Sequence, residues 1–171
     1  RYTLLIAALT AASACNQPAK LQDTAKADTS AVKTASAQTP DTANTAGVFN
    51  AYIGLKDQFL KSDVSGIKSA ASALEGKLAA IKGCSETAAL ANKIASATDL
   101  KEQRADFLLL SKDIITLVKG SKPKATTIYV DFCPMADSGK GGYWLSLNKE
   151  IENPYFPEHM KECGRVQEQI N

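Results

Sequence analysis

A hydrophobic repeat between residues 64 and 81 constrains the fold more than any other feature of the sequence. Its members are separated by alternating gaps of three and four positions: Val64, Ile67, Ala71, Leu74, Leu78 and Ile81. Side chains at these spacings share one face of an α-helix, so the repeat predicts a helix with a continuous apolar stripe. Ser62 and Asp63 stand where an N-cap is expected, and Gly83 stands where a C-terminal stop is expected. Such a stripe has to be covered, which favours an antiparallel helical bundle.

Three further segments show the same periodicity in weaker form. One begins near Gly47, one runs from about Glu86 to Ala97, and one begins at Asp99, where Glu102 completes a pattern similar to a capping box. Their inward-facing positions are predicted to include Phe49, Tyr52, Ile53, Phe59, Leu60, Leu90, Ile94, Phe107, Leu110, Ile114 and Leu117. Together these patterns predict a mainly α fold, an up-and-down bundle of about four helices.

The sequence changes character after Gly120 and Pro123. Residues 126–132 are β-branched and aromatic, and they predict a single short extended segment lying across the bundle. Its alternation, together with the tryptophan further along, predicts four buried side chains in this part of the chain, namely Ile128, Val130, Phe132 and Trp144.

Beyond the extended segment, the glycines of residues 139–142 predict a flexible loop. Residues 146–151 are expected to form a short helix that ends before Asn153 and Pro154. A final short helix is predicted to begin at Pro157 or Glu158, because proline is well suited to a first helical position.

The N-terminus predicts export and lipid anchoring. An apolar run over residues 4–9 is followed by small residues and then Cys15, which is the pattern of a lipoprotein signal peptide and its modified cysteine. Asn16 favours the outer membrane, on the periplasmic face of the cell envelope. The alternative is an ordinary secreted protein with an unmodified Cys15. Residues 16–45 lack aromatic side chains and predict a disordered tether, which leaves residues 46–171 as the folded domain.

The charge balance and the small set of catalytic residue types exclude several functions. The chain has 20 basic and 18 acidic residues, so it lacks the basic excess of a nucleic-acid-binding protein. It has one histidine and contains neither a Gly-x-Ser-x-Gly motif nor a phosphate-binding loop. We therefore expect a protein that is not an enzyme.

Soft metal ligands gather near the C-terminus. Both methionines, the only histidine and two of the four cysteines lie there: Cys133, Met135, His159, Met160 and Cys163. If residues 158–168 are helical, the last three of these share one face. Thiolate and thioether sulfur favour Cu(I). The sequence therefore predicts a Cu(I) site formed by the two cysteines and two methionines, with His159 as a further candidate, and Trp144 and Tyr155 as candidate walls around it.

Three interpretations of Cys133 and Cys163 remain open at this stage. In an oxidising compartment the pair can form a structural disulfide, worth about 3–4 kcal/mol for a loop of this length in the chain-entropy model. The methionines would then fill gaps in the core. Alternatively the thiols bind metal, or they stay unpaired. Cys84 would be left as an odd thiol that pairs with one of them or is simply buried, and His159 on its own is more typical of a solvent-facing residue.

The C-terminal motifs resemble a known bacterial family. They are Phe-Cys-Pro-Met-Ala at 132–136, Tyr-Trp-Leu-Ser at 143–146, Ile-Glu-Asn-Pro-Tyr-Phe at 151–156 and Met-Lys-Glu-Cys-Gly at 160–164. Residues 46–171 are similar to a domain of unknown function found in Bacteroidetes lipoproteins and fused to periplasmic adaptor subunits of copper/silver efflux pumps. Pro157 departs from the family pattern, which more often has glycine there.

This resemblance implies an accessory role in metal efflux or homeostasis, with an efflux-pump adaptor or another envelope protein as partner. The alternative function is a non-catalytic protein-interaction module of the envelope that has a structural disulfide and no metal.

Overall fold

The computed structural model describes residues 42–121 and 126–171, which belong to one compact unit. The predicted signal peptide, Cys15 and residues 16–41 of the predicted tether lie outside the described residues. The first helix, α1 (Thr42–Leu60), begins four residues before the expected start of the domain at residue 46. Among the helices that are described, none has both the length and the apolar character needed to cross a membrane.

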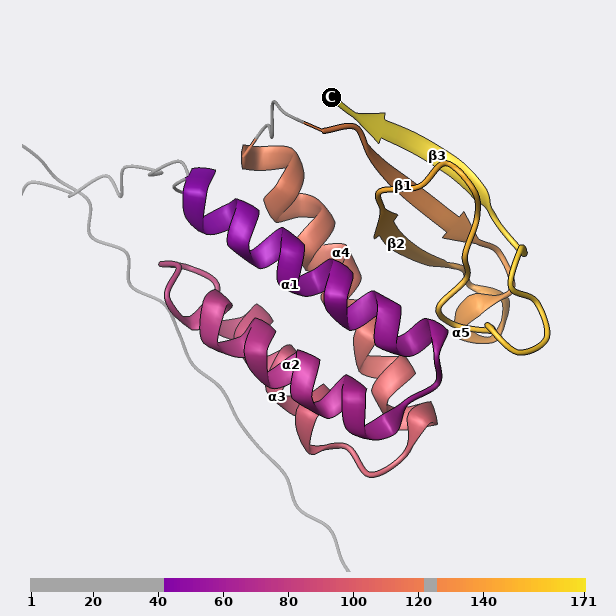
Figure 1. Cartoon of the computed structure of the whole chain (residues 1–171), viewed down its shortest axis with the longest axis horizontal. Helices are drawn as coiled ribbons and strands as arrows, with labels where there is room; N and C mark the ends of the chain where they lie inside the picture. The colour runs from indigo at the N-terminus through magenta and orange to yellow at the C-terminus, as the bar shows by residue number, and fades with distance from the viewer. Residues whose placement is uncertain (1–41, 122–125) are drawn as a thin grey trace, which may run out of the picture. The chain divides into compact units, whose positions relative to one another are not determined.

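Four helices form the predicted bundle. After α1 come α2 (Val64–Ala79), α3 (Ser85–Ser96) and α4 (Leu100–Ser121), and consecutive helices pack against one another (Figure 1). The central residues of the repeat that predicted α2 are fully buried: Ile67, Ala71, Leu74 and Leu78. The bundle and its inward-facing stripe are therefore confirmed.

The expected helix ends are also present. The backbone N–H of Gly66 donates to Asp63 Oδ1 at 3.0 Å, which satisfies one of the free donors in the first turn of α2. The N–H of Glu102 donates to Asp99 Oδ1 at 2.9 Å in the same way at the start of α4. Gly83 follows α2 with φ of 90°, a conformation that glycine adopts without a steric penalty.

The C-terminal part differs from the prediction because it forms a sheet. Strands β1 (Ile128–Cys133), β2 (Gly142–Ser146) and β3 (Arg165–Ile170) make a three-stranded antiparallel sheet in the order β2-β1-β3. A four-residue turn of helix, α5 (Ala136–Gly139), connects β1 to β2. Figure 1 shows β2 beside the bundle and β3 on the far side of β1. The single extended segment predicted over residues 126–132 is therefore the central strand of a sheet.

Two predicted helices are wrong. Residues 143–146 belong to β2 and residues 147–150 form bends, so there is no helix over 146–151. The predicted final helix is replaced by turns at 157–162 and by β3. Without partners, both edges of β1 would carry unpaired backbone donors and acceptors, and pairing with β1 outweighs the modest local preference of these segments for helix.

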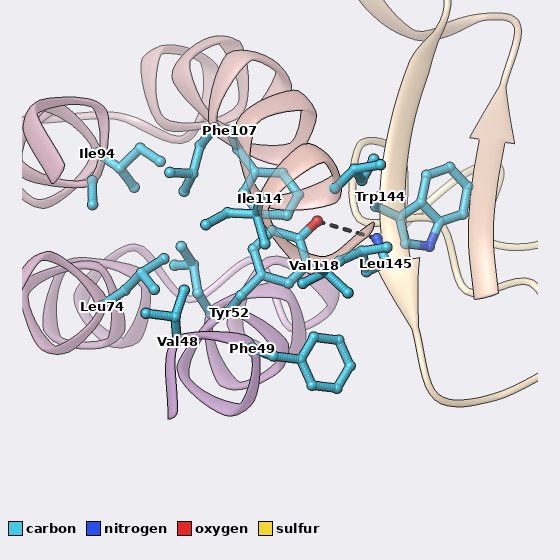
Figure 2. Packing of buried hydrophobic residues seen from close by; sticks show 14 of the residues in the cluster. Val48, Phe49, Tyr52, Leu74, Ile94, Phe107, Ile114, Val118, Trp144 and Leu145 are labelled. Carbon is cyan, nitrogen blue, oxygen red and sulfur yellow. Dashed lines mark hydrogen bonds between the residues drawn. The ribbon is translucent and has the colours of Figure 1, made fainter. Parts of the chain in front are cut away.

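A hydroxyl group of the bundle forms a hydrogen bond with the outer edge of β2. The backbone N–H of Leu145 donates to the Tyr52 hydroxyl at 3.3 Å (Figure 2), and that hydroxyl also lies 2.8 Å from Ser111 Oγ. Tyr52 belongs to α1 and Ser111 to α4, so both helices hold the sheet. An edge strand with free N–H groups would otherwise remain open to pairing with another chain.

The burial pattern of β1 departs from strict alternation. Ile128, Val130 and Trp144 are buried as predicted, whereas Phe132 is only half-buried and Asp131 is fully buried. The register between β1 and β3 shifts between Val130 and Asp131, where β3 carries the extra residue. The pairing of β1 with β2 is unbroken, so Val130 and Asp131 face opposite sides of the sheet, and both sides are covered at this point. The predicted buried set omits Asp131 because an alternating pattern indicates only one buried face.

Candidate functional site

Two cysteines that are 30 positions apart in the sequence meet at one end of the sheet. Cys133 is the last residue of β1 and is fully buried, whereas Cys163 lies just before β3 and is half-buried. Their Sγ atoms are 3.5 Å apart. The antiparallel pairing of Phe132 with Arg165 accounts for this proximity, because it aligns the end of β1 with the start of β3.

The two sulfur atoms are thiols in this structure, and their separation exceeds the disulfide bond length of about 2.05 Å. The hydrogen bond that joins the thiols, followed by burial, raises the pKa of Cys163 above its usual value. At neutral pH Cys163 therefore retains its proton. A metal ion that binds Cys163 as a thiolate has to displace this proton.

The other predicted ligands do not converge as expected. Met135 precedes α5 and is 54% exposed, and His159 is also exposed. Met160 is half-buried in a turn, where its carbonyl oxygen accepts from the N–H of Cys163 at 3.0 Å. The helix face that was to carry His159, Met160 and Cys163 does not exist. Within residues 42–121 and 126–171, no three His, Cys, Asp or Glu side chains are close enough to hold a metal ion.

Aromatic residues lie next to the thiol pair but belong to the core. Trp144 and Tyr155 are both buried, and their rings meet edge to face with centroids 5.9 Å apart. The far edge of the Trp144 indole approaches Gly164, the residue after Cys163: a Cβ atom on Gly164 would lie 3.1 Å from Trp144 Cη2. The indole therefore packs against the backbone next to Cys163, and its predicted role as a wall of a metal site stays a prediction.

Cys84 takes no part in this site. It is a free thiol immediately before α3, on the bundle side of the chain. Burial, with a smaller contribution from the charge of Asp113, raises its pKa. The structure therefore pairs Cys133 with Cys163 and leaves Cys84 as the odd thiol.

Sequence reasoning missed a buried polar cluster beside the thiol pair. Asp131 is 0% exposed, and neither of its carboxylate oxygens has a hydrogen-bond partner within the described part of the chain. The indole N–H of Trp144, which faces Asp131 across the strand pair, likewise has none there. Lys56 of α1 is nearly as buried, and its Nζ lies 2.8 Å from Asp57 Oδ1. The only signal in the sequence was an acidic residue within an apolar strand.

Burial dominates the electrostatics of this cluster. Loss of hydration raises the pKa of Asp131 from 3.8 to about 7, while the positive charge of Lys56 and the Trp144 indole partly oppose the shift. Tyr52 is affected by the same cause, with burial as the largest contribution to its raised pKa. Asp131 therefore changes its charge near neutral pH inside the contact between sheet and bundle.

One comparison with known proteins gives a match. Residues 48–126 match the model of a family described as a protein of unknown function, DUF3347. The match covers most of the bundle and ends before Cys133. No curated protein and no solved structure matches the chain. The predicted domain of unknown function is thereby confirmed, whereas its envelope and metal-efflux context stays a prediction.

Proposed function

We propose that this protein binds a soft metal ion such as Cu(I) at the Cys133–Cys163 pair and serves metal efflux or homeostasis at the cell envelope. The observation that carries the proposal is the meeting of two free thiols, 3.5 Å apart, from distant parts of the chain. Thiolate sulfur is the ligand type that soft ions prefer over hard ones. A lipid on Cys15 would hold the protein on the periplasmic side of the outer membrane, within reach of an efflux-pump adaptor.

The separation of the sulfur atoms disfavours linear two-coordinate binding of a metal ion. Two sulfurs 3.5 Å apart subtend about 100° at an ion bound at about 2.3 Å, the length of a zinc–thiolate bond. A linear two-coordinate ion would need the sulfurs about 4.6 Å apart at the same bond length. The pair therefore suits a trigonal or tetrahedral ion that takes further ligands.

Met160 is the best-placed source of a third ligand. It lies in the same turn as Cys163, joined to it by a backbone hydrogen bond of 3.0 Å. Met135 follows Cys133 by two residues, and its 54% exposure leaves its thioether free to turn toward the pair or toward a partner protein. His159 remains an exposed candidate. A site of two thiolates and thioethers would select against hard cations such as Mg²⁺ and Ca²⁺.

Competition for Cu(I) with a chromophoric chelator tests the proposal on fully reduced protein. Cys133→Ser and Cys163→Ser are each expected to lose most of the affinity, Met160→Leu a smaller part, and the control Cys84→Ser almost none. Affinity should weaken as pH falls, because metal and protons compete for the thiolates. If the wild-type protein and the Cys133→Ser/Cys163→Ser double variant compete equally poorly, the metal site is wrong.

The alternative function, an interaction module pinned by a disulfide, is supported by the same two thiols. Closing the sulfurs from 3.5 Å to the bond length of about 2.05 Å needs a movement of about 1.5 Å. Thiol titration of the native protein from its own compartment separates the two functions. Free thiols at Cys133 and Cys163 favour metal binding, and a quantitative disulfide between them favours the interaction module.

A further inference from the structure

Asn153 is a fully buried polar residue in the segment that leads from β2 to Cys163. It is 0% exposed, and both ends of its side-chain amide are used. Its Nδ2 donates to the carbonyl oxygen of Cys163 at 3.0 Å, and its Oδ1 accepts from the N–H of Tyr155 at 2.9 Å. Its backbone N–H donates to the carbonyl of Lys161 at 2.8 Å. One residue thus connects three points of the segment.

Only one of these contacts is an ordinary turn interaction. An asparagine that accepts from the N–H two residues later forms an Asx-turn, which is common in loops and carries no functional meaning. The bond from Nδ2 spans ten residues and ends on the backbone of Cys163 itself. Because the carbonyl carbon is bonded to Cα, holding this carbonyl restricts where Cys163 can point its Sγ.

Other residues hold the segment at points before and after Cys163, and among the described side chains only that of Asn153 hydrogen-bonds to the Cys163 backbone. Arg104 of α4 donates to the carbonyl of Pro154 at 3.3 Å and lies 3.2 Å from Glu158 Oε1. Gly164 adopts φ of 149° and passes so close to β1 that a Cβ would lie 2.9 Å from the carbonyl oxygen of Phe132. These contacts fix the segment before and after Cys163, and Asn153 fixes the residue that carries the thiol.

We propose that Asn153 is the positioning residue of the thiol pair: its amide holds the Cys163 backbone so that Sγ stays opposite Cys133 Sγ. The proposal rests on the proposed function for its relevance to metal binding. The positioning itself can be measured without metal, because two thiols held together also close to a disulfide more readily than two free ones. Asn153 would then act as the supporting residues of metal sites do, through the ligand and not through the ion.

The test measures the thiol–disulfide equilibrium of the full chain, with Cys15 and Cys84 replaced by serine so that only the pair reacts. The dithiol reduces one oxidised glutathione to two reduced glutathiones as its own disulfide forms. Asn153→Asp keeps the size and the acceptor but loses the amide donor, and we expect the equilibrium constant to fall about tenfold, the effect of one buried hydrogen bond. Cu(I) affinity should fall with it.

Two controls separate positioning from stability. Asn148→Asp makes the same chemical change at an exposed residue after β2 and should leave the equilibrium constant unchanged. Ile94→Val removes one methylene from the bundle core, so it should lower the unfolding free energy without changing the equilibrium constant. If Asn153→Asp does not fold, Asn153→Ser replaces it, because serine keeps an oxygen acceptor for the Tyr155 N–H and lacks the amide donor.

The outcomes distinguish this proposal from the proposed function. A folded Asn153 variant with the wild-type equilibrium constant overturns the positioning role, whatever its metal affinity. A tenfold fall that Ile94→Val also shows overturns it too, because the effect would then follow stability. A fall specific to Asn153, in a protein whose wild type binds no Cu(I), supports the positioning role and rejects the metal site.

Discussion

The helical bundle (residues 42–121) and the sheet region (residues 126–171) are built on different principles. The bundle helices bury a large apolar core together with four polar residues, Thr45, Lys56, Gln103 and Ser111, and contacts between consecutive helices hold it together. The sheet region is smaller and less regular, and it buries Asp131, Ser146 and Asn153 among its apolar residues. Its strands pair across long stretches of chain, with β3 hydrogen-bonded to β1.

The difference indicates where function resides. Buried apolar residues in a helix stabilise the fold and do little else, whereas a buried carboxylate or a buried pair of thiols costs stability unless something compensates. Among the described residues, the buried carboxylate Asp131 and the pair of thiols, Cys133 and Cys163, lie in the sheet region. The match to the family of unknown function covers the bundle instead. The proposed metal site therefore belongs to the sheet region, and the bundle supports that region.

The largest expected effect comes from placing a charge in the bundle core. Leu74 is fully buried in α2, so Leu74→Asp should destabilise the protein by at least about 4 kcal/mol, close to the whole stability of a small domain. Because the sheet is docked on α1 and α4, it should unfold at the same midpoint, as monitored by circular dichroism and Trp144 fluorescence. Leu109→Asp, at a site that is 49% exposed, is the control. A sheet that stays folded after the bundle has unfolded would show that the two regions fold independently.

The next effect is a pH dependence that arises at the contact between the regions. An unfolded aspartate loses its proton near pH 4, whereas Asp131 in the folded protein keeps its own to about pH 7. Folding therefore takes up a proton between these values, and the unfolding free energy should fall as pH rises through this window. The total is at most about 4 kcal/mol, from 1.36 kcal/mol per pKa unit.

Asp131→Asn should remove this pH dependence and stabilise the protein at pH 8. Urea denaturation of both proteins from pH 4 to pH 8 measures the difference. Asp106→Asn on α4 is the matched control and should retain the wild-type slope. If the unfolding free energies of the wild type and Asp131→Asn change with pH in parallel, a partner group compensates the buried carboxylate. The two regions would then differ less in how they bury polar groups.

The smallest effect concerns the hydroxyl that joins the regions. Tyr52→Phe removes the partner of Ser111 Oγ and of the Leu145 N–H, and it should cost about 1–2 kcal/mol. Hydrogen exchange should accelerate at the Leu145 amide more than at amides inside α2. Tyr129→Phe, at a half-buried residue of β1, should change neither quantity. An unchanged exchange rate at Leu145 after Tyr52→Phe would mean that the edge of β2 does not depend on the bundle.

The bundle could be predicted from the sequence because its signals are local. The repeat from Val64 to Ile81, the cap at Asp63 and the stop at Gly83 all act within a few residues of where they occur. The central strand was found for the same reason, since residues 126–132 alternate in a recognisable way. Cys133 and Cys163 were predicted as metal ligands or disulfide partners, but their pairing was left open because Cys84 could also pair with either of them, and the helix predicted to present Cys163 is wrong.

The remaining features depend on partners that no local pattern reveals. Residues 165–170 become a strand because the edge of β1 is available to them, and Gly142 to Ser146 because the other edge is. Asp131 is buried because the second face of the sheet is covered too, with the buried Trp144 directly opposite it on β2. The sequence predicts a helix that ends before Asn153, whereas the amide of Asn153 reaches Cys163 ten residues later.

Periodicity and residue chemistry are properties of the chain, so the four helices, their apolar faces and the sulfur ligands could be identified from the amino-acid sequence. Which sulfurs meet, which polar groups lose their water and which strand edges are covered was settled by folding. These outcomes depend on contacts between residues that are far apart in sequence. Their free energies are fixed by neighbours that assemble only when the sheet docks on the bundle.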